Sequence, residues 1–180
     1  TKHTMFTNIK KVLPGETLVY SIEHKKFVQS QRTFITPSSD GALDNEQFRH
    51  EAHATVKMST LGIRKFGVFL SGGLDSTLVA HELKNILGEV DSFTNEMNPN
   101  VVIGEDFNSD ANCAKQFADD IGLNHHRIET TPNTVETYWT PAMQHMEQPV
   151  YNMSMPMYYY TNKCLSEKCV VVTMAGDMGD

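Results

Sequence analysis

From residue 65 onward, short apolar segments alternate with amphipathic ones, and this alternation restricts the fold more than any other feature of the chain. It predicts strands at 66–70, 90–94, 125–129 and 169–174, and helices at 76–87, 106–122, 133–147 and 154–167. The β-branched run of the last strand is typical of a strand that is buried on both faces. Strands that alternate with helices form a parallel sheet with right-handed crossovers. We therefore predict an α/β fold in which a parallel, twisted sheet carries helices on both faces.

The residues before this alternation have a different pattern. Residues 17–22 and 26–28 alternate loosely between apolar and polar side chains around a polar turn, which predicts a short β hairpin. Residues 37–41, Pro-Ser-Ser-Asp-Gly, break the pattern, and Asp44 is placed to cap a following helix. We set the boundary near residue 40, with a β segment at 1–39 and the α/β domain at 40–180.

Composition limits what such a domain can bind. The chain has 180 residues, 39 % of them apolar, which is enough for one core and too little for a second full domain. A formal net charge of −7 argues against nucleic acid as a partner. No segment approaches the roughly 18 apolar residues of a membrane span, and three cysteines without paired spacing favour reduced thiols and a cytoplasmic location. A small phosphate compound is the expected ligand.

The first strand of the α/β part runs into residues 71–76, Ser-Gly-Gly-Leu-Asp-Ser, which we call the glycine loop. In an open parallel sheet, ligands bind beyond the carboxyl ends of the strands. Gly72 and Gly73 let backbone N–H groups approach phosphate oxygens, the next helix directs its positive end there, and Ser71 and Ser76 add hydroxyl donors. The loop matches neither the Walker A pattern nor G-x-G-x-x-G. A tight strand-to-helix turn without a ligand is the alternative.

Asp75 is an unexpected residue for a phosphate loop, because its carboxylate repels phosphate unless a cation lies between them. Mg²⁺ prefers one or two carboxylates together with phosphate oxygens and water. The chain also has more acidic than basic residues, 22 against 15, so a carboxylate-held metal ion suits its composition. We therefore expect Mg²⁺ to bridge Asp75 and the phosphates.

The last predicted strand runs into residues 175–180, Ala-Gly-Asp-Met-Gly-Asp, which we call the acidic loop. Taken alone, this segment is more typical of an Asp-rich surface turn. If the two loops are neighbours, Asp180 can share the metal with Asp75, and Asp177 can contact the substrate or a developing charge. The pairing of the loops is what favours a site.

Two further features are ambiguous in the sequence. His125 and His126 are adjacent on a predicted strand and must point to opposite faces, so one packed and one exposed histidine are expected rather than a metal site. Glu147 is compatible both with a substrate contact and with the end of a helix.

With both loops in view, the sequence from about residue 40 to its end resembles the synthetase domain of the glutamine-hydrolysing asparagine synthetase family. The order and spacing of the family's motifs recur in the glycine loop, the strand at 91–94, the helix before His125 and His126, Glu147–Pro149, Met155–Tyr158 and the acidic loop. Residues 4–34 resemble the last strands of that family's glutaminase domain. The resemblance implies an ATP-pyrophosphatase, or PP-loop, fold of the Rossmann-like adenine nucleotide alpha hydrolase type, and a chain that is a partial sequence.

The resemblance also implies a reaction. ATP would adenylate the side-chain carboxylate of aspartate with release of pyrophosphate, and ammonia would then displace AMP to give asparagine. ATP and Mg²⁺ are the implied cofactors, a glutaminase domain or subunit is the implied ammonia source, and a homodimer is left open. Carried over by position, Asp75, Asp177 and Asp180 act in catalysis, and Asp75 and Asp180 hold the metal. The implied ATP and pyrophosphate contacts are Leu70, Ser71, Gly72, Gly73, Asp75, Ser76, Asn95, Ala175 and Gly176.

Three positions depart from the family pattern: Asn95 replaces an apolar residue, Ala175 a serine and Met178 a glycine. The glutaminase nucleophile, an N-terminal cysteine, and a later phosphate-binding lysine are also not found in this sequence. Two alternatives therefore stay open. One is another amide-forming ATP-pyrophosphatase, such as a β-lactam synthetase-like enzyme with a different acceptor. The other is a non-catalytic, nucleotide-binding fragment of a longer or split protein.

Overall fold

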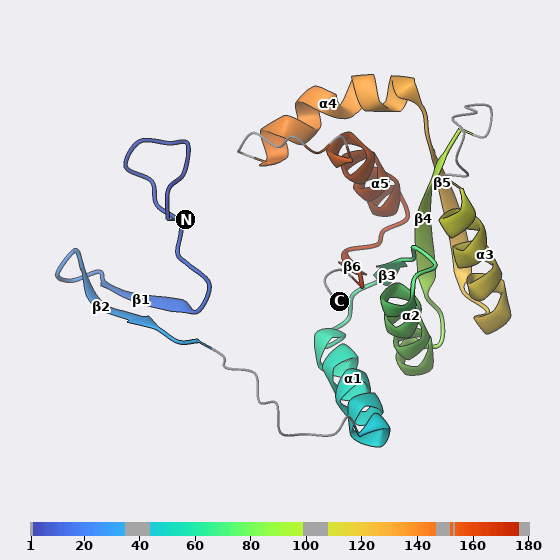
Figure 1. Ribbon diagram of the computed structural model, residues 1–180, viewed down its shortest axis with the longest axis horizontal. Helices are drawn as coiled ribbons and strands as arrows, with labels where there is room; N and C mark the ends of the chain where they lie inside the picture. Colours follow the sequence, from blue (N-terminus) through green and yellow to red (C-terminus); the bar gives the residue numbers. More distant parts are fainter. Residues whose placement is uncertain (1, 35–43, 99–107, 147–151, 153, 177–180) are drawn as a thin grey trace. The chain divides into compact units, whose positions relative to one another are not determined.

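The chain divides into two compact units, Thr1–Leu43 and Asp44–Asp180. A computed structural model describes residues 2–34, 44–98, 108–146, 152 and 154–176 (Figure 1). The predicted boundary segment at 37–41 lies outside these residues, as do Glu147 and the predicted helix start at residue 106. The assignment of residues 1–39 to the end of a glutaminase domain stays a prediction.

The first unit contains the predicted hairpin. Strands β1 (Glu16–Ser21) and β2 (Lys26–Arg32) pair antiparallel, with an irregularity between Val19 and Tyr20. Tyr20 packs edge-on against Phe27, with their ring centroids 5.2 Å apart. The hairpin prediction is confirmed.

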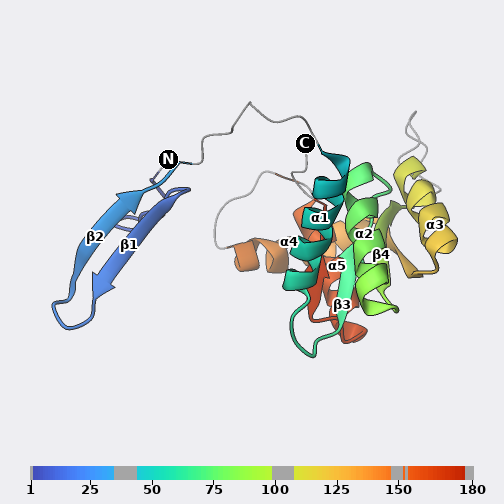
Figure 2. The same ribbon diagram turned by 90° about the horizontal axis from the view of Figure 1, so that it is seen from below.

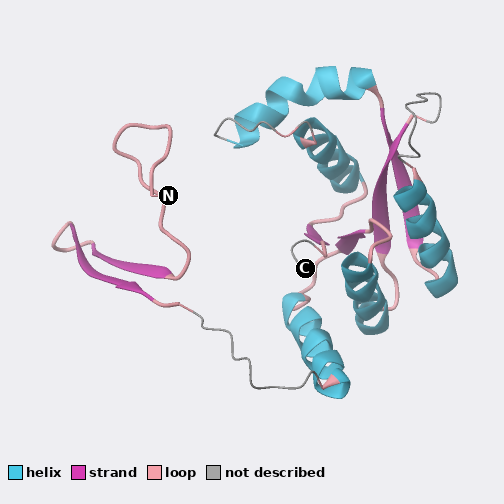
Figure 3. Cartoon of the chain, viewed as in Figure 1, coloured by secondary structure: helices cyan, strands magenta, loops and turns pink. Residues whose placement is uncertain are grey.

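The second unit is built on a four-stranded parallel sheet with the strand order β5-β4-β3-β6. Its strands alternate with helices along the chain (Figure 3). The strands are β3 (Phe66–Phe69), β4 (Asp91–Met97), β5 (Asn124–Thr130) and β6 (Val172–Met174), and the helices are α1 (Asn45–Ser59), α2 (Leu74–Leu87), α3 (Ser109–Ile121), α4 (Pro132–Met146) and α5 (Met155–Glu167).

Local capping explains where several helices begin and end. The Asp44 carboxylate accepts hydrogen bonds from the backbone N–H groups of Glu46 and Gln47 at 2.9 and 3.3 Å, which starts α1. Helix α3 ends at Gly122, which adopts a left-handed conformation (φ 71°) that stops the helix. Helix α2 differs, because its N-cap residue is Gly73 and no side chain caps it. Its first N–H groups are thus left available at the carboxyl edge of the sheet.

Each face of the sheet carries its own apolar cluster. On one face, residues of β3 pack with α2 and α3, among them Val68, Leu83 and Ala114. On the other face, Phe93 of β4 packs with Leu165 of α5. The two views in Figures 1 and 2 show the sheet between these two sets of helices. The predicted parallel sheet with helices on both faces is confirmed.

The last strand is shorter and less buried than predicted. Strand β6 contains only Val172–Met174, all half-buried, and Val171 before it is 70 % exposed. The reason is the way in which the chain leaves α5: the Val170 N–H bonds to the Leu165 carbonyl at 3.1 Å, and Cys169 takes a left-handed conformation (φ 60°). The prediction of a strand over 169–174 buried on both faces is therefore wrong.

Two global expectations can be compared with the structure. In the described residues, no helix combines the length and apolar character that crossing a bilayer requires. The three cysteines, Cys113, Cys164 and Cys169, are all free thiols. The cytoplasmic location stays a prediction.

Asp91 connects three segments at the amino-terminal edge of the sheet. Its carboxylate lies 2.7 Å from the Lys65 ammonium and 2.9 Å from Nε2 of His126, and Lys65 also donates to the carbonyl of Lys168 at 3.0 Å. Burial opposes ionisation of Asp91, but the hydrogen bonds from Lys65 and His126 outweigh it, so the pKa of Asp91 lies below its ordinary value. The ionised carboxylate therefore stabilises the fold.

We expect Asp91→Asn to lower the free energy of unfolding by about 2 kcal/mol at neutral pH, because hydrogen bonds to a charged group are lost. Since the pKa of Asp91 is lowered by folding, its contribution is present above the unfolded-state pKa and is lost as the pH falls through the folded-state pKa. The variant should therefore show a flatter pH dependence of stability below about pH 4. Urea unfolding at neutral pH and along an acid series measures both effects.

Asp119→Asn is the matched control, because Asp119 pairs with Lys115 within one helix and its side chain is 59 % exposed. We expect a loss of under about 0.5 kcal/mol there. Equal acid sensitivity in wild type and Asp91→Asn would contradict the assignment.

Candidate functional site

The glycine loop is held in shape by its two serines. The hydroxyls of Ser71 and Ser76 lie 2.9 Å apart, and Ser76 donates to the carbonyl of Gly73 at 3.1 Å. Ser76 also accepts from the Ser71 N–H at 3.2 Å, and Ser71 accepts from the Gly73 N–H at 3.3 Å. Because the Ser76 hydrogen is used within the loop, the Ser71 hydroxyl must donate to Ser76 here. Ser76 is thus primarily a shaping residue, while the exposed Ser71 can turn toward a ligand.

The two glycines of this loop have different surroundings. Gly72 has a positive φ of 83°, and a Cβ there would lie 2.8 Å from the carbonyl oxygen of Asp110 and 3.0 Å from the N of Ala114. Only glycine therefore allows the loop to rest on the first turn of α3. A Cβ at Gly73 would meet only the Ser71 hydroxyl, at 3.4 Å. The backbone at Gly73 thus stays open to an approaching ligand.

The amino terminus of α2 has the properties of an anion site. No side chain caps it, and Leu74 in its first turn is 84 % exposed. A helix end with free N–H groups and a positive dipole binds phosphate well. Asp75 lies half-buried in the same turn, and no lysine or arginine forms an ion pair with it among the described residues. The N–H groups at this helix end therefore suit a phosphate, and the Asp75 carboxylate suits a cation bound beside it.

Gly176 brings the acidic loop into contact with the glycine loop. A Cβ on Gly176 would lie 2.4 Å from the N of Ser76 and 2.5 Å from the carbonyl carbon of Asp75. The two loops thus meet at the amino terminus of α2, where Ala175 is exposed. Asp177 and Asp180 lie outside the described residues, so their assigned roles stay predictions, as does the consequence of Met178.

Leu70 and Asn95 lie where β4 passes the start of the glycine loop. Leu70 is buried, its N–H donates to the Phe93 carbonyl at 2.9 Å, and its own carbonyl accepts from the Thr94 hydroxyl. The backbone polar groups of Leu70 are therefore already bonded within the sheet. The side chain of Asn95 bonds to Thr161 of α5 at 2.6 Å. Sequence reasoning missed both threonines, because nothing in a local pattern signals a buried hydroxyl.

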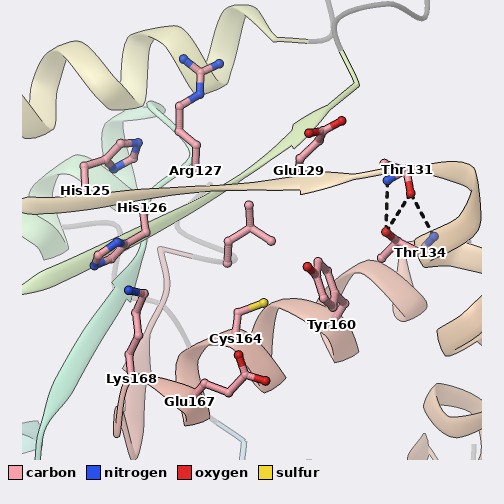
Figure 4. A pocket seen from close by; sticks show the side chains of 11 residues that line it. His125, His126, Arg127, Glu129, Thr131, Thr134, Tyr160, Cys164, Glu167 and Lys168 are labelled. Carbon is pink, nitrogen blue, oxygen red and sulfur yellow. Dashed lines mark hydrogen bonds between the residues drawn. The ribbon is translucent and has the colours of Figure 1, made fainter.

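His125 and His126 extend to opposite sides of β5, as expected (Figure 4). His126 stacks on Phe93 with centroids 5.0 Å apart, and Nδ1 of His125 lies 3.0 Å from the Ser92 hydroxyl. Burial, followed by the positive charges of Lys115 and Arg127, lowers the pKa of His125. The expectation that one histidine is exposed is wrong, because both are half-buried.

A separate pocket of about 850 Å³ lies beside β5 and α5 (Figure 4). It is lined by His125, His126, Arg127, Ile128, Glu129, Thr131, Thr134, Tyr160, Cys164, Glu167 and Lys168. None of the predicted site residues lines it, so it is distinct from the place where the two loops meet.

The parallel sheet with helices on both faces, and the glycine loop at its carboxyl edge, define an α/β protein. Two solved structures resemble it. An NH3-dependent NAD synthetase from Campylobacter jejuni is 17 % identical, with 72 % of this chain and 56 % of that chain covered at a TM-score of 0.47. An NMN synthetase from Francisella tularensis is 13 % identical, with 73 % and 54 % covered at a TM-score of 0.50. This chain thus spans just over half the length of either structure, and the second likeness is one of fold.

The sequence model of the asparagine synthase family matches residues 47–180. The chain therefore belongs to the asparagine synthase family, and the resemblance noted in the sequence is confirmed. A search of curated proteins finds no match.

Proposed function

We propose that this chain carries the adenylating site of an asparagine synthetase-type amide ligase. The observation that carries the proposal is the contact of Gly176 with Asp75 and Ser76, which brings the two loops together at the uncapped end of α2. Both loops lie within the residues matched by the family model. One glycine-rich turn alone would have left the alternative of a simple strand-to-helix connection open.

In the proposed reaction, an oxygen of the aspartate side-chain carboxylate bonds to the α-phosphorus of ATP as the bond to the β-phosphate oxygen breaks. Pyrophosphate leaves, and ammonia then attacks the acyl carbon, which releases AMP and forms asparagine. The uncapped N–H groups in the first turn of α2 hold the phosphates, and Gly72 and Gly73 let the backbone approach them. The Ser71 hydroxyl turns from Ser76 to a phosphate oxygen.

The described residues fit a magnesium ion in part. Asp75 offers a half-buried carboxylate beside the phosphate-binding N–H groups, which suits the preference of Mg²⁺ for few carboxylates plus phosphate oxygens. We assign Asp75 and Asp180 as its ligands and Asp177 as the group nearest the acyl phosphate. The ion would neutralise charge on the departing pyrophosphate. Ammonia comes from solution or from a glutaminase domain or subunit.

Exchange of labelled pyrophosphate into ATP tests the proposal, with each of the twenty amino acids supplied in turn with Mg²⁺. We expect aspartate alone to stimulate exchange, because only its acyl adenylate would form reversibly. Exchange with another carboxylate and none with aspartate favours the β-lactam synthetase-like alternative. Calorimetric binding of ATP without any exchange favours the non-catalytic fragment. Neither exchange nor binding at millimolar ATP would overturn every nucleotide-based function.

A further inference from the structure

Strand β5 lies at one edge of the four-stranded sheet, because the strand order is β5-β4-β3-β6. In the part of the chain that the structure describes, it pairs with β4 on one side only. The Asn124 N–H donates to the Val90 carbonyl at 3.0 Å, so the backbone groups of the even-numbered residues of β5 face β4. The backbone N–H and C=O groups of His125, Arg127 and Glu129 therefore face outward, where they can bond to a further strand.

This edge carries two exposed charged side chains, Arg127 and Glu129, which extend from the same side of β5 (Figure 4). Arg127 donates through Nε to Glu96 at 2.5 Å and through Nη1 to Asn112 at 3.0 Å. Glu129 lies directly opposite Glu96 in the pairing of β5 with β4, and like charges in such positions destabilise a sheet. Among the described residues, no lysine or arginine forms an ion pair with Glu129. Its carboxylate can therefore accept a cation from outside the chain.

We propose that β5 pairs antiparallel with β5 of a second copy of this chain, with the two-fold axis at Ile128, so that the two sheets join into one. The inference does not depend on the proposed function. In an antiparallel pair, residues whose backbone groups face the other strand lie opposite each other and exchange both hydrogen bonds. With the axis at Ile128, Arg127 lies opposite the partner's Glu129, and Glu129 lies opposite the partner's Arg127. The interface is isologous, so it closes as a dimer.

The charges favour this register over the neighbouring ones. An axis at Arg127 would place two arginines opposite each other, and an axis at Glu129 would place two glutamates there. The axis at Ile128 gives two pairs of opposite charge instead. A guanidinium group has five N–H donors, and the contacts of Arg127 with Glu96 and Asn112 use two of them. Arg127 can therefore keep both contacts and also bind the partner's Glu129.

The pocket of about 850 Å³ beside β5 provides room for the second strand. Its lining includes every residue from 125 to 129, so the pocket follows the open edge of the sheet (Figure 4). Tyr160 and Cys164 of α5 line its other side. Ile128 lies on this side of β5, and by symmetry the partner's Ile128 would extend on the same side of the joined sheet. The space along the edge thus suits an added strand.

The competing explanation is that Arg127 and Glu129 protect the edge, because charged side chains often prevent edge strands from pairing. Sedimentation equilibrium of the full chain over a range of concentrations separates the two explanations. Self-pairing predicts a monomer–dimer equilibrium with no larger species. A chain that stays monomeric at every concentration would overturn the proposal, whether the edge is protected or is occupied by a different protein.

Two single variants and their mixture test the register. In a self-pair, Arg127→Glu brings glutamate opposite glutamate, and Glu129→Arg brings arginine opposite arginine. Each variant alone should therefore dimerise about 10-fold or more weakly than wild type. Mixed in equal amounts, the two should form a heterodimer, because both cross-strand pairs then have opposite charges. A mixture that dimerises no better than the separate variants would overturn the register.

Glu51→Arg is the matched control, because Glu51 is an exposed residue of α1 and the change in charge equals that of Glu129→Arg. It should leave the dissociation constant of the dimer unchanged. A wild-type dimer that Glu129→Arg does not weaken would overturn the pairing of β5 and assign the dimer to another surface. If Arg127→Glu does not fold, because it loses the bond to Glu96, wild type and Glu129→Arg still decide the matter.

Discussion

Gly176→Ala is expected to lower the free energy of unfolding by about 3 kcal/mol and to weaken ATP binding about 10-fold or more. The added Cβ would lie 2.4 Å from the N of Ser76 and 2.5 Å from the carbonyl carbon of Asp75. Both are backbone atoms in the first turn of α2, so neither can rotate away as a side chain would. The two loops must separate, and the phosphate-binding N–H groups move with them. Chemical unfolding and calorimetric titration with ATP and Mg²⁺ measure the two effects.

Gly73→Ala is the matched control for stability. A Cβ there would meet only the Ser71 hydroxyl at 3.4 Å, and the φ of −75° suits any residue. The free energy of unfolding should therefore change by less than about 0.5 kcal/mol. If Gly176→Ala has the same free energy of unfolding and the same affinity for ATP as wild type, the contact between the two loops is not what forms the site.

The helices and strands of this chain were predictable where short-range chemistry decides them. Asp44 caps α1 through its own near neighbours, and Gly122 ends α3 by its left-handed conformation. The strand predicted at 169–174 was wrong, although the contact that ends α5 there is also short-range. The first half of this segment forms the turn in which the Val170 N–H bonds back to the Leu165 carbonyl. The β-branched composition of the segment gives no sign of that turn.

In the candidate site, some features follow from neighbouring residues and others from residues far apart in the sequence. The residue types of the glycine loop indicated a phosphate site, because glycine, serine and an uncapped helix end act together within six residues of sequence. The contact of Gly176 with Ser76 depends on β6 pairing with β3, and the bond between Thr161 and Asn95 depends on α5 packing over β4. Such pairs come together only through the sheet order, which local patterns do not encode.

Asp75→Asn is expected to weaken Mg²⁺-dependent ATP binding about 100-fold, because the variant loses the carboxylate assigned to the metal. Without Mg²⁺, we expect the substitution to have the opposite effect on the affinity for ATP. Asp75 then only repels the phosphates, so the neutral variant should bind metal-free ATP as well as wild type or better. The fold should be retained, because Asp75 is half-buried and forms no ion pair among the described residues. Calorimetric titration with ATP in Mg²⁺ and in a chelator gives both affinities.

Asp110→Asn provides the control, because Asp110 is an exposed acidic residue in the first turn of the neighbouring helix α3. It should leave both the affinity for ATP and its dependence on Mg²⁺ unchanged, since its carboxylate has no assigned ligand. A carboxylate in the first turn of a helix is stabilised by the helix dipole even without a metal. If Asp75→Asn retains the wild-type dependence on Mg²⁺, that dipole interaction is the whole reason for an acidic residue at this position, and the metal must be held elsewhere.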